Sequence, residues 1–193
     1  MPRSFMFTKE EIINAALDLT REQGFDAVTA RAMGTKLGTS HRPVFSYFDS
    51  MEELKSTILA AAEEIYQNYL KEDMARGKYP PYKASGMAYI RFAREEKELF
   101  KLLFMRDRTN EDKTKQTSEV EMISALICKQ VNISKERAMM FYLEMWTYVH
   151  GIATMIATNY YDWSEDLASQ TLTDMYQGLK LKYEKENLGN GFH

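Results

Sequence analysis

Signals that begin an α-helix recur along this chain, and few residues between them would break one. Thr8 is followed three residues later by Glu11, and Ser50 is followed by Glu53, which is the pattern of a helix capping box. Only four prolines and nine glycines interrupt the 193 residues, and the residues that favour helices, such as Met, Leu, Ala, Glu and Lys, are plentiful. The chain is therefore predicted to be all-α.

The N-terminal part predicts three short helices followed by a long one. The first is predicted over Thr8–Gly24 and the second over Thr29–Leu37, each ending at a glycine that can stop a helix. Ser40 is predicted to cap the third helix, and Pro43 falls in its first turn, where the missing N–H costs nothing. The long helix is predicted from Ser50 to about residue 73.

The remainder of the chain predicts a second helical domain. Helices are predicted over residues 82–96, 98–105, 119–131, 134–158 and 164–186, with a loop over 106–115. The last two have broad apolar faces, which is typical of a helix pair that packs against a copy of itself. We therefore expect a small N-terminal domain over 1–50, and a domain over 51–193 that forms a homodimer through its last two helices.

Composition limits the classes of function that this chain can have. A net charge of -3 argues against a surface that is broadly attracted to nucleic acid or to anionic lipid, so any nucleic-acid contact must be local. The single Cys128 cannot form an internal disulfide, and no apolar run approaches the roughly 20 residues that cross a membrane. A cytoplasmic protein with no membrane partner is expected.

Residues that could make an enzyme do not come together in the sequence. The chain has no HExxH, no GxSxG and no glycine-rich phosphate loop, and Cys128 with three histidines gives no metal-ligand spacing. Carboxylate pairs such as Glu95 and Glu96 diverge around a helix, so we expect them to be solvated. No catalytic residue, metal site or cofactor is predicted.

One segment stands apart from the acidic average of the chain. Between Arg31 and Phe48 there are four basic or histidine side chains and no acidic one. A short helix, a tight turn and a second short helix form a helix-turn-helix, in which a carboxylate would repel the phosphates along the DNA groove. Gly34 is predicted to permit close helix approach, with Val44, Phe48 and Leu54 buried. The alternative is that these helices belong to an ordinary bundle.

The longer run that contains this segment carries a more specific pattern. The elements of the pattern are Ala15-Ala16, Gly24-Phe25, Thr29, Leu37-Gly38, Ser40, Phe48, and Ser50 with Glu52-Glu53-Leu54. With these residues, the run from Phe7 to Leu59 resembles the DNA-binding domain of the TetR family of transcriptional regulators. The resemblance implies a dimeric, ligand-responsive regulator, most simply a repressor, that binds a palindromic double-stranded DNA operator.

The resemblance also implies which residues contact DNA. They are Arg31, Ser40, His41, Arg42, Pro43, Ser46 and Tyr47, most of them at positions that face bases, with Tyr47 at one that meets the backbone. Arg42 is the first candidate for direct readout, since a bidentate contact to guanine discriminates by about 1–3 kcal/mol. A solvated residue is the alternative for His41, and Lys36 is predicted to be a plain solvent-facing charge.

Two residues depart from the family pattern. The family often has Tyr where this chain has Phe45 and Lys where it has Met51, and those usual residues reach phosphate oxygens. Fewer phosphate contacts predict weaker binding or a shallower dependence on salt. The same two residues leave open an interaction or small-molecule-carrier module that has lost useful DNA binding.

The second domain is rich in aromatic and thioether side chains. A pocket for an unknown, apolar or aromatic small molecule is predicted from Phe92, Phe100, Phe104, Met105, Tyr142, Trp146 and His150. Ordinary core packing is the alternative for each of these residues.

A short motif within the second domain carries its own resemblance. The run WTYVHG, residues 146–151, resembles a Trp-x-x-x-His-Gly signature of one C-terminal subtype of the family. His150 would present a hydrogen bond to a pocket or be satisfied within an interface, and Gly151 is predicted to allow a close helix crossing.

Overall fold

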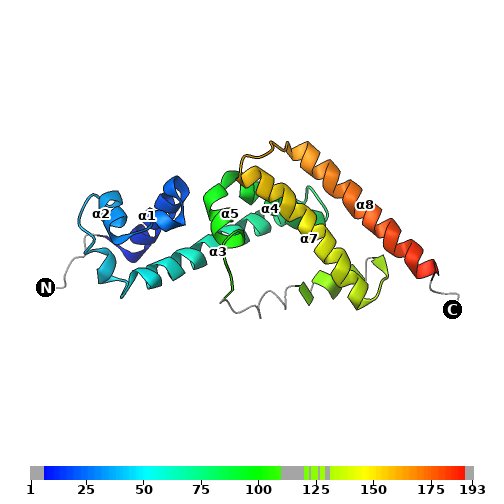
Figure 1. Cartoon of the computed structure of the whole chain (residues 1–193), viewed down its shortest axis with the longest axis horizontal. Coiled ribbons are helices and arrows are strands. Elements are labelled where there is room, and N and C mark those ends of the chain that lie inside the picture. The colour runs from blue at the N-terminus through cyan, green and yellow to red at the C-terminus, as the bar shows by residue number, and fades with distance from the viewer. Residues whose placement is uncertain (1–6, 110–119, 122, 126, 129–130, 190–193) are drawn as a thin grey trace.

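The protein is an elongated assembly of helices with its two termini at opposite ends (Figure 1). The computed structural model describes residues 7–109, 120–121, 123–125, 127–128 and 131–189. All regular structure in these residues is helical, which confirms the predicted all-α class. None of the helices described there is both long enough and apolar enough to span a membrane.

The helix-turn-helix unit occupies the N-terminal end of the molecule. Its elements are α1 (Lys9–Gln23), the short 3-10 helix η1 (Phe25–Ala27), α2 (Ala30–Lys36) and the 3-10 helix η2 (Val44–Ser46). The capping box before α1 is formed as predicted, because the Thr8 hydroxyl accepts from the Glu11 N–H at 3.1 Å and the Glu11 carboxylate accepts from the Thr8 N–H at 2.7 Å.

The third element of this unit is shorter than the Ser40 cap predicts. The Ser40 hydroxyl reaches only the Arg42 N–H, at 3.4 Å, and a regular α-helix does not follow. Instead, the Val44 N–H donates to the His41 carbonyl and the Ser46 N–H donates to the Pro43 carbonyl. Hydrogen bonds between residues three apart are those of a 3-10 helix, and here they form a single turn. The helix-turn-helix arrangement is present, but the short third helix is a 3-10 turn over Val44–Ser46 and does not begin at the predicted Ser40 cap.

A long helix, α3 (Met51–Arg76), leads from the helix-turn-helix unit to the helices of the second domain (Figure 1). The Ser50 hydroxyl accepts from the Glu53 N–H at 3.1 Å, as predicted, but the Glu53 carboxylate accepts from the Asp49 N–H rather than from that of Ser50. Gly77, with φ of 62°, ends the helix in the left-handed region that favours glycine.

The second domain packs its first two helices against α3. It contains α4 (Pro81–Glu95), α5 (Lys97–Phe104), helical residues within 120–131, α7 (Lys135–Ala157) and α8 (Glu165–Gly189). Helix α4 lies between α3 and α7, and α8 returns beside α7. Residues 106–109 are non-helical as predicted, whereas 110–115 of the predicted loop and residue 119 of the next predicted helix lie outside the described residues.

Candidate DNA-binding surface and aromatic cluster

Gly34 allows the turn of the helix-turn-helix to lie directly against α2. A Cβ atom at this position would come within 3.0 Å of the Thr39 carbonyl oxygen and 3.1 Å of the His41 nitrogen. The Thr39 N–H donates to the Gly34 carbonyl at 2.9 Å, and Gly38, with φ of 66°, makes the bend. The close approach predicted at Gly34 is therefore confirmed.

Three apolar side chains anchor this surface from beneath. Val44, Phe48 and Leu54 are fully buried in the core, as predicted. Val44 lies within η2 and Phe48 lies two residues after it, and both side chains pack into the core. These two anchors fix which side of the short 3-10 helix faces outward.

Most of the residues predicted to contact DNA are exposed to solvent. Arg31, Ser40, His41, Arg42 and Ser46 are exposed, and Pro43 is half-buried. Within the described residues, neither Arg31 nor Arg42 forms an ion pair with a carboxylate. The Ser46 hydroxyl donates to the Arg42 carbonyl at 3.3 Å, so it engages the backbone of Arg42 and not its guanidinium.

Tyr47 and the two departures from the family pattern differ in their surroundings. The Tyr47 hydroxyl donates to the Phe7 carbonyl at 2.9 Å, so it ties down the segment before α1. Phe45 is 42% exposed and meets the edge of the His41 ring, with centroids 5.7 Å apart. Met51 is partly buried against the core. Neither Phe45 nor Met51 offers a polar atom to a phosphate.

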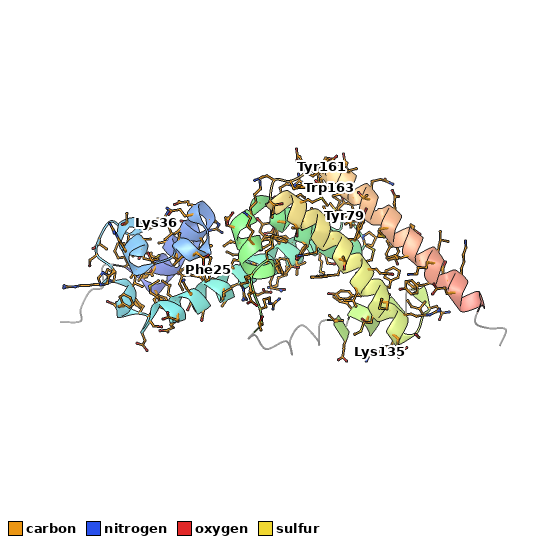
Figure 2. The ribbon with its side chains drawn as sticks, viewed as in Figure 1. Phe25, Lys36, Tyr79, Lys135, Tyr161 and Trp163 are labelled. Carbon is orange, nitrogen blue, oxygen red and sulfur yellow. The ribbon has the colours of Figure 1, made fainter. Side chains whose placement is uncertain are left out.

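Lys36 lies on the same domain and is labelled in Figure 2. Its amino group lies 2.5 Å from the Glu22 carboxylate, so it fastens the end of α2 to the end of α1. The prediction of a plain solvent-facing charge was wrong for this residue. An open hollow of about 550 Å³ lies beside it, lined by Leu19, Gln23, Thr29, Arg31, Ala32, Thr35 and Lys36.

The second domain contains an aromatic cluster, which we define as Tyr66, Tyr89, Phe92, Phe100 and Phe104. The ring centroids of Tyr66 and Phe104 are 5.2 Å apart, those of Tyr89 and Phe104 are 4.7 Å apart, and those of Phe100 and Phe104 are 5.3 Å apart. Phe92 and Phe100 are fully buried. Edge and tilted contacts of this kind suit aromatic pairs, so the cluster is a packed apolar unit.

His150 closes the cluster on the side of α7. The Tyr89 hydroxyl lies 2.8 Å from Nδ1 of His150, and the Trp146 ring stacks on the His150 ring with centroids 4.9 Å apart. Burial lowers the pKa of His150 and raises the pKa of Tyr89, so both groups are neutral near pH 7. The site therefore offers hydrogen-bonding groups without a formal charge at the edge of an apolar cluster.

The predicted ligand residues are only partly brought together. Phe92, Phe100, Phe104, Trp146 and His150 lie in or beside the aromatic cluster. Tyr142 is half-buried, and it lies close enough to Tyr89 to raise the pKa of that phenol. Met105 is 42% exposed and is the member least enclosed by the domain.

Sequence reasoning missed Tyr66, Tyr69 and Tyr89 as members of this site. Tyr66 comes from α3, the helix that also leads to the DNA-binding domain, and its ring lies 5.3 Å from that of Phe92. Tyr69 meets Phe92 at the same centroid distance. Tyr66 and Tyr69 are three residues apart on α3, which puts them on one face of the helix. That spacing could have identified both as inward-facing residues, but not as neighbours of Phe92.

The described residues show no close crossing at Gly151, where one was predicted. A Cβ atom there would meet nothing within 4 Å. The neighbouring Ile152 and Ala153 are buried, so Gly151 lies on another face of α7 than the one that packs into the core.

Glu96 also differs from its prediction. Its carboxylate binds Arg21 of α1 through two hydrogen bonds, of 2.8 and 2.9 Å, and its side chain is only 15% exposed. Glu95 instead accepts from the Tyr69 hydroxyl at 2.9 Å. The two carboxylates do diverge, but Glu96 is part of an interdomain contact rather than a solvated face. The part of the chain that the structure describes holds no group of His, Cys, Asp and Glu residues suited to a metal ion.

Comparison with known proteins identifies the family. Residues 12–56 match the bacterial regulatory proteins of the tetR family, and residues 82–177 match a Tetracyclin repressor-like C-terminal domain. This chain belongs to the TetR family. It is therefore a TetR-family transcriptional regulator, and the two matched regions correspond to its helix-turn-helix unit and its second helical domain.

Two relatives agree with this assignment over most of the chain. An uncharacterized HTH-type transcriptional regulator of Mycobacterium tuberculosis is 22% identical over 194 residues, covering 98% of this chain and 87% of that protein. A TetR-like transcriptional regulator from a Rhodococcus species shares the fold, with a TM-score of 0.67 at 14% identity over 88% of this chain and 93% of that one.

Proposed function

We propose that this TetR-family regulator is a homodimeric repressor that binds a palindromic operator and releases it when a small molecule enters the second domain. The observation that carries the proposal is the exposure of Arg31 and Arg42 in the helix-turn-helix unit, without carboxylate partners among the described residues. Nothing in the packing of this unit requires two guanidinium groups there. Arg42 would read a guanine, while Arg31, Ser40, His41, Pro43 and Ser46 complete the contact surface.

Exposed apolar side chains support a homodimer through the last two helices. Met140, Leu143 and Trp146 on α7 and Leu181 on α8 are each at least 40% exposed, although the two helices lie side by side. Single exposed apolar residues are ordinary, but several large ones on two neighbouring helices support an interface. Two copies related by a two-fold axis would place their DNA-binding domains on half-sites about 34–36 Å apart.

The aromatic cluster supports a small apolar or aromatic ligand. Phe92, Phe100 and Phe104 would form the wall, and Trp146 with His150 would supply a ring stack and a neutral hydrogen-bonding group. Because the cluster is packed in this structure, a ligand would have to displace rings such as Phe104, which is less buried than Phe100. A ligand with higher affinity for the displaced arrangement would shift the population of the dimer toward it.

The rival proposal is an interaction or carrier module without useful DNA binding. Phe45 and Met51 favour it, because neither reaches a phosphate with a polar atom, and Tyr47 uses its hydroxyl on Phe7. We propose that these changes weaken the phosphate contacts without abolishing binding. The slope of binding affinity against salt concentration should then correspond to fewer than about eight released counterions.

The deciding experiment is selection of bound duplexes from a random DNA library with the purified protein at near-physiological salt. We expect an enriched palindrome whose half-site centres lie about one helical turn, or about 34–36 Å, apart. The variant that replaces both Arg31 and Arg42 with Ala is the control, and it should enrich nothing. No enrichment by the folded, dimeric wild-type protein would favour the carrier or interaction module.

The division of the chain into domains 1–50 and 51–193 belongs to the same proposal.

A further inference from the structure

The two domains also meet where α1 packs against α5. Arg21, in the last turn of α1, donates from Nε and Nη2 to the two carboxylate oxygens of Glu96, at 2.8 and 2.9 Å. The paired residues are 75 positions apart in the sequence. A guanidinium that donates twice to one carboxylate fixes direction as well as distance.

Glu96 occupies the corner between α4 and α5, directly behind the aromatic cluster. Its N–H donates to the Phe92 carbonyl at 2.8 Å, and its carbonyl accepts from the Phe100 N–H at 2.8 Å. Both rings are fully buried in the cluster. The backbones of Phe92 and Phe100 are therefore both hydrogen-bonded directly to that of Glu96.

Arg21 is equally well connected to the DNA-binding surface. It lies on α1, whose Ile12 and Leu19 are buried in the core that also holds Val44 and Phe48. Lys36 ties the end of α2 to Glu22, the neighbour of Arg21. The helix-turn-helix unit therefore moves with α1.

Helix α3 connects the two domains. Its C-terminal half is fastened to α4 by Arg91, which pairs with Glu72 at 3.0 Å and Asp73 at 3.1 Å and lies 4.2 Å from the Tyr69 ring. Its N-terminal half packs against α1. Helix α1 also packs against α5, and the Arg21–Glu96 pair gives this contact a fixed direction.

We infer that the Arg21–Glu96 ion pair sets the orientation of the DNA-binding domain and carries movement of the aromatic cluster to it. The inference rests on the proposed function in taking the cluster as the ligand site and the first domain as the DNA reader. Arg21 and Glu96 are positioning residues that touch neither ligand nor DNA. A partly exposed pair adds little to folding stability, so its contribution is to geometry.

The orientation is measured directly as a distance between spin labels. Labels are placed by Glu10→Cys on α1 and Met74→Cys on α3, both exposed positions, in a Cys128→Ser background. Labelled protein is diluted with unlabelled protein so that each dimer carries one labelled copy. We expect a narrow distribution for the intact pair and a clearly broader one for Arg21→Ala and for Glu96→Gln.

Two controls separate orientation from loss of charge. Arg76→Ala removes an arginine that pairs with an aspartate three residues before it, as Arg21 does with Asp18, but that spans no domain boundary. It should leave the distribution narrow. The double variant Arg21→Glu with Glu96→Arg should narrow it again. An unchanged distribution in both single variants would overturn the inference.

Transmission is tested by combining changes. Phe100→Leu alters the cluster conservatively, and we expect it to shift the mean label distance when Glu96 is intact and not in Glu96→Gln. The same shift in both backgrounds would refute transmission through this pair.

DNA binding keeps the two proposals distinguishable. The quantity measured is the ratio of the affinity for the selected duplex to the affinity for a duplex whose half-sites lie one base pair farther apart. This ratio should be several-fold lower for Glu96→Gln than for the wild-type protein. If the wild-type protein selects no duplex and the label distances still respond, the proposed function fails and the orientation contact stands. If duplexes are selected and the distances do not respond, the inference fails alone.

Discussion

The two domains differ in how their proposed functional residues relate to folding. In the first domain, Arg31 and Arg42 project from the surface, and the residues that stabilise the fold, such as Val44 and Phe48, lie beneath them. In the second domain, Phe92 is both a proposed ligand residue and a fully buried part of the core. Function and stability are therefore separable in the DNA-binding domain and combined in the aromatic cluster.

The largest expected effect is the loss of a buried ring. Phe92→Ala should lower the free energy of unfolding by about 3–5 kcal/mol, because it removes a large side chain from a packed cluster. Met105→Ala, at an exposed neighbour, should change it by no more than about 0.5 kcal/mol. Denaturant unfolding of both variants measures the difference. Equal, small effects would show that the cluster is loosely packed and would weaken the comparison.

Replacing both arginines tests separability in the first domain. Arg31→Ala with Arg42→Ala should weaken specific DNA binding by about 1–3 kcal/mol for each arginine that hydrogen-bonds a base in the wild-type complex. The free energy of unfolding should change by about 0.5 kcal/mol or less per residue. Binding is measured on the selected duplex and stability by denaturant unfolding. A control that removes two charges elsewhere, Arg76→Ala with Lys180→Ala, should leave specific binding nearly unchanged. Unfolding of the arginine variant would mark these residues as structural.

The same comparison explains which features could be predicted from the sequence. The Thr8–Glu11 capping box depends on residues three apart, and Gly34 lies five residues from the carbonyl that it accommodates. Such local features follow from the order of residues. The prediction at Ser40 failed although it too was local, because burial of Val44 and Phe48 fixed a 3-10 turn that capping preferences do not describe.

Contacts between distant segments were beyond prediction. Arg21 meets Glu96 across 75 positions, and Tyr89 meets His150 across 61. Nothing in the spacing of either pair indicates its partner. Composition nevertheless indicated the cluster, because aromatic side chains concentrated in the second domain have few places to lie except its interior.

Two glycines provide a matched test of backbone contact, with a smaller effect. Gly34→Ala should destabilise the protein by about 1–3 kcal/mol, since the added methyl meets backbone atoms at 3.0–3.1 Å that cannot rotate away. Gly151→Ala meets nothing within 4 Å and should stabilise α7 by about 0.5–1 kcal/mol. Thermal unfolding at a fixed protein concentration compares the two. Destabilisation by Gly151→Ala, with a dimer that dissociates more readily, would place Gly151 at a crossing between copies.

The smallest expected effect concerns the charge of His150. Because burial lowers the pKa of His150 below its ordinary value of 6.5, the unfolded chain takes up a proton at higher pH than the folded chain does. The free energy of unfolding should therefore decrease as pH falls from about 6.5 toward the lower folded-state pKa, and His150→Gln should remove that part of the decrease. Urea unfolding of both proteins at about pH 7.5 and about pH 5.5 measures it, since contributions from carboxylates are common to both.

The result bears directly on the contrast between the domains. His41 is exposed in the first domain, whereas His150 is partly buried in the second. An identical pH dependence in His150→Gln and the wild-type protein would mean that His150 is well solvated. In that case His150 would lie outside the apolar site, and the stack with Trp146 would belong to the surface of α7 rather than to the ligand-binding interior.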